Sequence, residues 1–332
     1  MPKGIMERLA EGPVLGDGGY LLELEKRGYV QAGPFTPEVA VEHPDALEQL
    51  HREFARAGAE FLTTMTFYAS DDKLETVGMK GMVDDINRSA VEVARKVAAE
   101  SDVLVAGDLS LTWAYEPDEA VTHDHVRELF DRQLAAMTDA GGVDFWVGET
   151  FSYLGEALLF VERAKATGLP VMVTMCFEQK EPRSYEGTTP GECAKELADA
   201  GADIVGVNCL NGPEQMLPIA VEMRAAVAGV PVAAQPVAYR TSGDKPDFTS
   251  YPNFPYGLTT MTLGRGEMAE WARHAQEANL ELIGSCCGSV AEHVRAMAKV
   301  LGKLPSEERE WKSTGDKAMS AYEYYGHTET EV

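Results

Sequence analysis

The chain has 332 residues, of which 45% are hydrophobic and 25% are charged, as is ordinary for a globular protein with one large core. Its 54 acidic residues outnumber 29 basic ones, and the net charge of -25 disfavours binding to nucleic acid or to an anionic membrane surface. The N-terminal segment has no apolar signal region, and no apolar run approaches the roughly 18 residues of a membrane span. We therefore expect a cytoplasmic protein with no membrane partner.

Apolar segments of strand length alternate along the chain with segments of helical spacing. Residues 37–57, for example, place Val41, Ala46, Leu50 and Phe54 on one helical face. The predicted strands are residues 14–19, 60–67, 103–110, 145–153, 171–177, 204–209, 230–238 and 282–288. Eight such units predict an α/β fold, a (β/α)8 TIM barrel over residues 1–304. The alternative is an open doubly wound sheet, but residues 17–20 lack the G-x-G-x-x-G turn that would favour it.

Two segments fall outside this alternation. Residues 239–264 are rich in Pro, Tyr, Phe and Ser, and a barrel would place them over its site as a lid; the alternative is a surface loop without a catalytic role. Residues 305–332 are a polar C-terminal tail, which either contacts a neighbouring subunit of a homo-oligomer or is disordered.

Three cysteines lie at the ends of predicted strands. Cys286 and Cys287 close the eighth strand, and Cys209 closes the sixth. A lone strand-end cysteine is commonly a small buried hydrophobe, but the carboxyl ends of parallel strands meet at one rim, and three thiols there predict a zinc site with an open fourth position. Cys176, after the fifth strand, is a further candidate for touching this site, whereas Cys193 is expected to be structural.

Other strand ends carry carboxylates and aromatic rings. Asp17 lies at the end of the first strand and Glu149 at the end of the fourth, whereas Thr64, Phe67 and Tyr68 end the second. These side chains predict a place for a cation beside the zinc. Alternatively Asp17 caps a turn, Glu149 pairs with a buried arginine and the aromatic rings belong to the core.

Zinc held by three thiolates favours activation of a substrate thiol over generation of hydroxide.

Taken together, these motifs resemble the homocysteine S-methyltransferase family, and within it the betaine-dependent branch. The resemblance extends from Met6 to about Leu304. It rests on Gly-Asp-Gly-Gly at 16–19, Leu-Glu-Lys-Arg-Gly-Tyr-Val at 24–30, Thr-Phe-Tyr-Ala-Ser at 66–70, Gly-Val-Asn-Cys at 206–209 and Cys-Cys-Gly at 286–288.

The resemblance implies a role for each site residue. Cys209, Cys286 and Cys287 would bind Zn2+, and the homocysteine sulfur would take the fourth position. Asp17 and Glu149 would hold the homocysteine ammonium, and Gly18 and Thr64 would receive its carboxylate. Tyr68, with Phe67 and Phe35, would surround the onium group of the methyl donor, and Trp113, Tyr239 and Phe254 are further candidates.

Three positions depart from the betaine-dependent pattern. Phe35 stands where that pattern has a tryptophan that anchors the betaine carboxylate, Thr150 replaces a tyrosine, and Ser285 replaces a glycine. Phe35 has no N–H to donate, so glycine betaine, dimethylsulfoniopropionate, S-methylmethionine and a cyclic betaine all stay open as donors, with glycine betaine in first place. A barrel that binds thiol or onium compounds without turnover is the alternative function.

Overall fold

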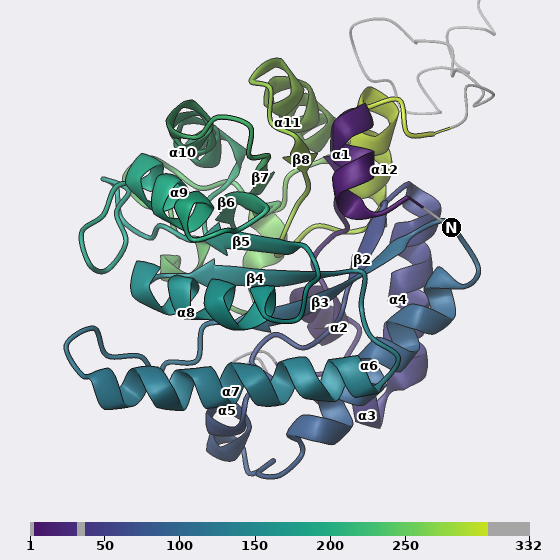
Figure 1. Ribbon diagram of the computed structural model, residues 1–332. Coiled ribbons are helices and arrows are strands. Elements are labelled where there is room, and N and C mark those ends of the chain that lie inside the picture. Colours follow the sequence, from purple (N-terminus) through teal and green to yellow (C-terminus); the bar gives the residue numbers. More distant parts are fainter. Residues whose placement is uncertain (1–2, 32–36, 305–332) are drawn as a thin grey trace, which may run out of the picture.

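The computed structural model describes residues 3–31 and 37–304, which form a barrel of parallel strands surrounded by helices (Figure 1). The eight strands pair in the order β1-β8-β7-β6-β5-β4-β3-β2, so the (β/α)8 prediction is confirmed. Their bounds are β1 Val14–Leu15, β2 Phe61–Thr63, β3 Leu104–Ser110, β4 Phe145–Phe151, β5 Val171–Met175, β6 Ile204–Asn208, β7 Val232–Gln235 and β8 Leu282–Ile283. Most are shorter than the apolar segments that predicted them, because the ends of those segments turn into loops at the rim.

The helices occupy the intervals between strands. They are α1 Ile5–Glu11, α2 Leu21–Lys26, α3 Val39–Glu42, α4 Pro44–Ala57, α5 Asp71–Thr76, α6 Val83–Ala98, α7 Ala120–Asp139, α8 Leu154–Lys165, α9 Pro190–Asp199, α10 Pro213–Ala226, α11 Arg265–Glu277 and α12 Ala291–Val300. The helix predicted over residues 37–57 is broken between α3 and α4. Pro44 causes the break, since proline has no N–H and disfavours helical backbone at His43 before it.

The barrel closes between β1 and β2 through side chains as well as backbone. These two strands share no ladder, but the Glu60 N–H donates to the Leu15 carbonyl at 2.9 Å, and the Leu15 N–H donates to the Glu60 carboxylate at 2.8 Å. Toward the rim, the Thr63 N–H donates to the Asp17 carboxylate at 2.7 Å. Asp17 is therefore fixed in place at this seam.

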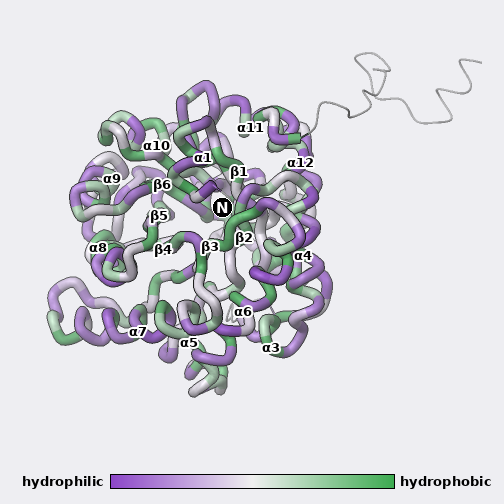
Figure 2. Tube along the Cα trace, turned by 45° about the vertical axis from the view of Figure 1, so that its right-hand side comes forward, coloured by the Kyte–Doolittle hydropathy of each residue, from purple (hydrophilic) through white to green (hydrophobic). Residues whose placement is uncertain are grey.

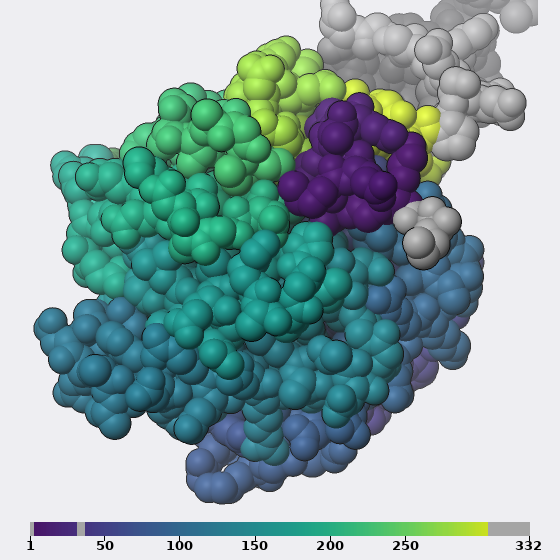
Figure 3. Space-filling model, in the orientation of Figure 1, coloured from purple at the N-terminus to yellow at the C-terminus, as the bar shows by residue number. Residues whose placement is uncertain are grey.

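An apolar plug fills the barrel below the rim. Its buried members include Val14, Phe61, Leu104, Ala106, Phe145, Val147, Met172, Ile204, Ala233 and Leu282. Ile5 and Leu9 of α1 join the same cluster, so α1 covers the amino-terminal end of the strands. Figure 2 views the molecule with this helix in front of the ring of strands, and in Figure 3 the purple N-terminal segment lies on the near face. Because the plug and α1 fill that end, the described residues leave room for a ligand inside the barrel at the carboxyl end of the strands.

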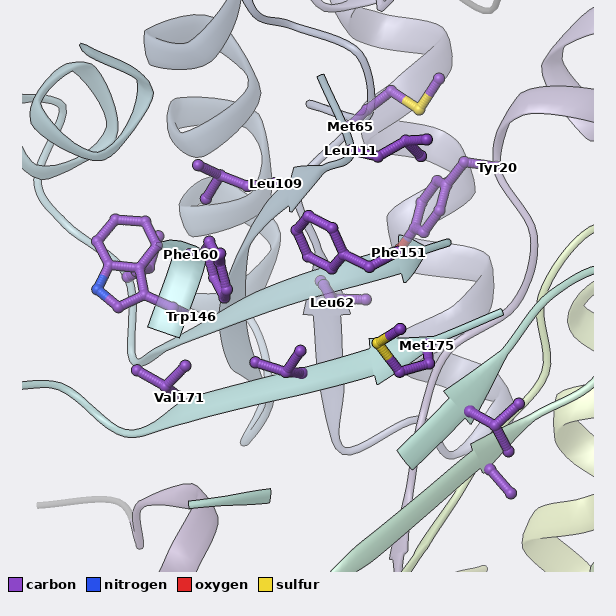
Figure 4. Packing of buried hydrophobic residues seen from close by; sticks show 14 of the residues in the cluster. Tyr20, Leu62, Met65, Leu109, Leu111, Trp146, Phe151, Phe160, Val171 and Met175 are labelled. Atoms are coloured by element: carbon purple, nitrogen blue, oxygen red, sulfur yellow. The ribbon is translucent and has the colours of Figure 1, made fainter. Parts of the chain in front are cut away.

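A second apolar layer packs the helices against the outer face of the strands. Trp146, Phe151 and Phe160 form part of it (Figure 4). Gly148 makes this close packing possible, since a Cβ there would lie 2.4 Å from the Phe160 ring. No helix among the described residues is long and apolar enough to cross a membrane. Phe35 and the predicted tail at 305–332 lie outside the described residues.

Candidate metal and substrate site

A pocket of about 160 Å³ opens at the carboxyl end of the strands, above the apolar plug. It is similar in volume to the engineered cavity of about 150 Å³ that binds benzene in another protein. Its lining combines thiols, carboxylates, the Gly18-Gly19 turn and aromatic rings. The predicted site residues that line it are Asp17, Gly18, Thr64, Phe67, Tyr68, Glu149, Cys209, Cys286 and Cys287.

Three thiols meet in this pocket. The sulfur atoms of Cys209, Cys286 and Cys287 lie within 4.8 Å of one another, and the Cys209 and Cys287 sulfurs are 3.7 Å apart. That separation is too long for a disulfide, but it matches the spacing of about 3.8 Å that follows from tetrahedral geometry and metal–sulfur distances of about 2.3 Å. These three residues could therefore hold one metal ion.

Two glycines allow the cysteine pair to approach its neighbours. Gly288 has φ of +79°, which reverses the chain directly after Cys287. Gly19, on the first rim loop, lies so near the pair that a Cβ there would be 2.6 Å from the Cys286 carbonyl oxygen. The Gly19 N–H also donates to the Ser289 carbonyl, which ties the loop that carries Asp17 to the loop that carries the thiols.

Asn208 connects the thiols to the carboxylates. It is fully buried at the end of β6, where its Nδ2 donates to the Glu149 carboxylate at 2.6 Å and to the Thr150 hydroxyl at 2.8 Å. Its Oδ1 accepts from the Thr150 N–H and from the Thr174 hydroxyl, both at 2.8 Å. The same Nδ2 lies 4.0 Å from the Cys286 sulfur. This network fixes Glu149 relative to the thiol cluster.

Asp17 is buried and Glu149 is partly buried, and the pKa values of both carboxyl groups are raised. Burial raises the pKa of Asp17 to about 6, although hydrogen bonds from Tyr20 and Thr63 oppose the rise. Burial, with the negative charge of Asp17, raises the pKa of Glu149 to about 8. Removing an ionised carboxylate from water costs free energy unless a cation lies beside it. This arrangement therefore favours a positively charged ligand.

Gly18 and Thr64 differ in what they offer a ligand. Within the described part of the chain, the Gly18 N–H has no acceptor, so it can donate to a ligand oxygen. The Thr64 hydroxyl lies 2.8 Å from the Thr66 hydroxyl, accepts from the Asp108 N–H at 2.9 Å, and is near the Met137 sulfur on the outer helix α7. Its side chain is therefore already hydrogen-bonded away from the barrel axis.

Phe67 and Tyr68 form one side of the pocket, whereas Trp113 packs beside Tyr68 and does not line the pocket. Phe67 and Tyr68 lie with ring centroids 4.3 Å apart, and Trp113 follows 5.2 Å from Tyr68 with 67% of its surface exposed. Burial raises the pKa of Tyr68 well above its usual range, and negative charge on Cys176, Cys209 and Cys287 adds to the rise. The Tyr68 phenol is therefore within electrostatic reach of the thiols.

The predicted lid lies over the site but contributes different side chains from those expected. Phe248 and Thr249 of this segment line the pocket, and the Phe248 N–H donates to the Leu210 carbonyl beside Cys209. Tyr239 is buried, and its ring stacks on Phe248 with centroids 5.3 Å apart. Neither Tyr239 nor Phe254 lines the pocket, so Phe248 is the lid aromatic closest to a ligand.

Cys176 lies next to the site without joining the metal cluster. It is buried, its sulfur is 3.3 Å from the Ser152 hydroxyl, and burial raises its pKa to about 12. Cys193 is also buried, on α9, as expected for a structural residue.

Left-handed backbone marks the rim. Six non-glycine residues in the described part of the chain have positive φ, and Asn279 alone lies away from the carboxyl ends of the strands. The others are Tyr68, Trp113, Thr150, Cys209 and Leu210. Such backbone conformations cost free energy and persist only where the surrounding structure holds them. In proteins they cluster at functional sites. Sequence alone gave no sign of this feature.

Sequence reasoning missed two carboxyl-terminal strand positions that shape the pocket. Asp108 of β3 and Gln235 at the end of β7 both line it. An aspartate inside an otherwise apolar predicted strand was the available signal, since a buried charge is rare unless it has a partner or a function.

The fold and the pocket define a (β/α)8-barrel protein with a three-thiol centre beside the carboxyl groups of Asp17 and Glu149. Residues 14–301 match the family described as homocysteine S-methyltransferase. The chain belongs to this homocysteine S-methyltransferase family.

Individual relatives agree with this assignment. Betaine–homocysteine S-methyltransferase 1 of Danio rerio is 44% identical over 311 residues, covering 90% of this chain and 76% of the relative. S-methylmethionine–homocysteine S-methyltransferase BHMT2 of Pongo abelii is 40% identical over 325 residues, covering 94% of this chain and 86% of the relative. The metallated homocysteine methyltransferase MmuM of Escherichia coli superposes with a TM-score of 0.70 at 21% identity, covering 87% of this chain and 96% of that structure, and supports the barrel fold.

Proposed function

We propose that the protein transfers a methyl group from an onium donor, glycine betaine in first place, to homocysteine, giving methionine, with zinc at Cys209, Cys286 and Cys287. The observation that carries this proposal is the meeting of three thiols, the carboxyl groups of Asp17 and Glu149, and the aromatic rings of Phe67 and Tyr68 in one pocket. Membership of the family and 44% identity to a betaine-dependent relative support the same reaction.

The thiol cluster fits zinc. Three sulfur ligands are a common zinc set; here they lie within 4.8 Å of one another, with one pair at tetrahedral spacing, and the fourth position would be left for a substrate atom. When bound, zinc lowers the pKa of a substrate thiol so that its sulfur is ionised at neutral pH. The chain itself keeps the cluster in place through Asn208 and through the left-handed backbone at Cys209.

The carboxyl groups suit the amino-acid part of homocysteine. Asp17 and Glu149 would accept hydrogen bonds from its ammonium, whose positive charge offsets the cost of their burial. The Gly18 N–H, which has no acceptor within the described residues, would donate to its carboxylate, and Thr64, which lines the same pocket, would lie against it. These residues orient the substrate and move no proton.

The methyl donor would approach from the aromatic side. A lone pair on the homocysteine sulfur forms the new S–C bond as the donor C–N bond breaks, and that bonding pair stays on nitrogen, so glycine betaine leaves as a neutral amine. Tyr68, Phe67 and Phe35 would stabilise the cationic donor by about 0.5–2 kcal/mol through their ring faces. This attraction weakens as the positive charge disappears, which favours product release.

S-methylmethionine is the second candidate donor, because a relative named for that donor is 40% identical to this chain.

A panel of donors tests the proposed methyl transfer: zinc-loaded protein and homocysteine are incubated with glycine betaine, dimethylsulfoniopropionate, S-methylmethionine and a cyclic betaine. We expect methionine to form fastest with glycine betaine. If methionine forms faster with another donor, that compound is the methyl donor. If no donor gives methionine, the protein binds thiol or onium compounds without turnover.

A further inference from the structure

The pocket lining includes a third carboxyl group, and one of its oxygens has no hydrogen-bond partner among the described residues. Asp108 lies on β3, lines the pocket and is only 1% exposed. Its backbone N–H donates to Thr64 and its carbonyl accepts from Thr66, but its side-chain Oδ1 is buried without a hydrogen bond within the described structure. Buried polar atoms in proteins are nearly always paired, so an unpaired carboxyl oxygen on a residue that lines a pocket indicates that the side chain lacks a partner which a ligand can supply.

The sheet places Asp108 between the two carboxyl groups already described. β3 pairs with β2 on one side, where Thr63 holds Asp17, and with β4 on the other, which carries Glu149. Ser110 is in register with Glu149, so Asp108 lies two residues deeper on the same inward face. Asp17, Glu149 and Asp108 therefore all line the pocket from neighbouring parts of the rim, and the lining among described residues includes no Lys, Arg or His.

The electrostatics agree with this placement. Burial raises the pKa of Asp108 well above its usual range, and the negative charges of Glu149 and Asp17 raise it further. The three groups are therefore close enough to repel one another when ionised. A single cation between them would remove that repulsion, and Asp108 keeps an acceptor oxygen whether it is ionised or protonated.

We propose that Asp108 is a third acceptor for the α-ammonium group of homocysteine, completing a cage with Asp17 and Glu149 that selects thiols bearing an amino group. An ammonium group has three N–H donors, and the cage offers one carboxyl group for each. The proposal deepens the proposed function and rests on homocysteine being the methyl acceptor. It makes Asp108 a specificity-determining residue rather than part of the apolar plug beneath it.

The test compares homocysteine with 4-mercaptobutanoate, which has the same thiol and carboxylate but no amino group. Binding of both to the zinc-loaded full chain is measured by calorimetry for the wild type, Asp108→Asn and Asp108→Leu. Leucine keeps the branched shape but removes the acceptor, and it should not prevent folding, because it replaces an unpaired buried polar group with an apolar one. Glu156→Gln is the matched control, since Glu156 is a buried carboxyl group outside the pocket lining.

We expect Asp108→Leu to lower the affinity for homocysteine by about tenfold to 100-fold and Asp108→Asn by a smaller factor, with the affinity for 4-mercaptobutanoate nearly unchanged. The control should bind both ligands like the wild type. An equal loss for both ligands, or no loss for homocysteine, would overturn the role of Asp108 while leaving the proposed function intact. A wild-type protein that binds neither thiol would overturn the proposed function and this inference with it.

Discussion

Replacing Asn208 by Ala should destabilise the barrel and loosen its site together. The side chain makes four hydrogen bonds, with Glu149, with the Thr150 hydroxyl and N–H, and with Thr174. At about 1 kcal/mol for each bond, their loss amounts to about 4 kcal/mol, a large part of the roughly 5–15 kcal/mol that stabilises a typical domain. Thr174→Val is the matched control, because it removes only one of the four bonds and should cost about 1 kcal/mol.

Urea unfolding of both variants, at one fixed excess of zinc, measures this difference. With a slope of about 3 kcal/mol per molar urea, the expected difference of about 3 kcal/mol lowers the midpoint of Asn208→Ala about 1 M below that of Thr174→Val. Homocysteine affinity should also fall in Asn208→Ala, since Glu149 loses its donor. If the two variants unfold at the same urea concentration, Asn208 does not connect the carboxyl groups and thiols in the way the hydrogen bonds indicate.

Four further outcomes are expected. Changing any one of the three rim cysteines to Ala should abolish tight zinc binding, and full zinc occupancy in all three variants by metal analysis would contradict the assignment. Asp17→Asn and Glu149→Gln should each weaken homocysteine binding by about 1.5–3 kcal/mol in calorimetry, and unchanged affinity in both would remove them from the site. Burial raises the pKa of Asp17 from 3.8 in the unfolded chain to about 6 in the folded protein. As the pH rises from about 4 to 6, the free energy of unfolding of the wild type should therefore fall by up to about 3 kcal/mol relative to Asp17→Asn. If the free energies of unfolding of both proteins change with pH in parallel, the pKa of Asp17 is not raised by burial. Phe35→Trp should raise the preference for glycine betaine over the other donors, and an unchanged preference would place Phe35 outside the donor site.

The fold could be predicted because its signals are local. Each strand is a short apolar run and each connecting helix has its own periodicity, so eight repeats indicated the barrel without knowledge of any long-range contact. The convergence of Cys209 with the Cys286-Cys287 pair followed from topology, since the carboxyl ends of parallel strands share one rim. The prediction of one helix over residues 37–57 failed for an equally local reason. The helical pattern of apolar residues continues across Pro44, but proline cannot continue a preceding helix.

Side-chain direction within the rim could not be predicted in the same way. Tyr239 was a candidate for the donor pocket, yet it packs behind Phe248, and the identity of the aromatic that faces the pocket depends on how the lid folds back on itself. Thr64 has a hydroxyl turned toward Thr66 because alternation along β2 sends the Thr63 side chain, and not that of Thr64, to Asp17. These choices depend on register and on loop conformation, which single residues do not encode.

Methyl transfer from glycine betaine carrying deuterated methyl groups tests the central claim most directly. The zinc-loaded wild-type protein is incubated with this donor and homocysteine, and methionine is examined by mass spectrometry, with Cys286→Ala as the matched variant. The predicted result is methionine that carries the deuterated methyl group from the wild type and none from the variant. Unlabelled or absent methionine from the wild type, or equal labelling by a variant that lacks zinc, would contradict transfer to a thiol activated at the three-cysteine centre.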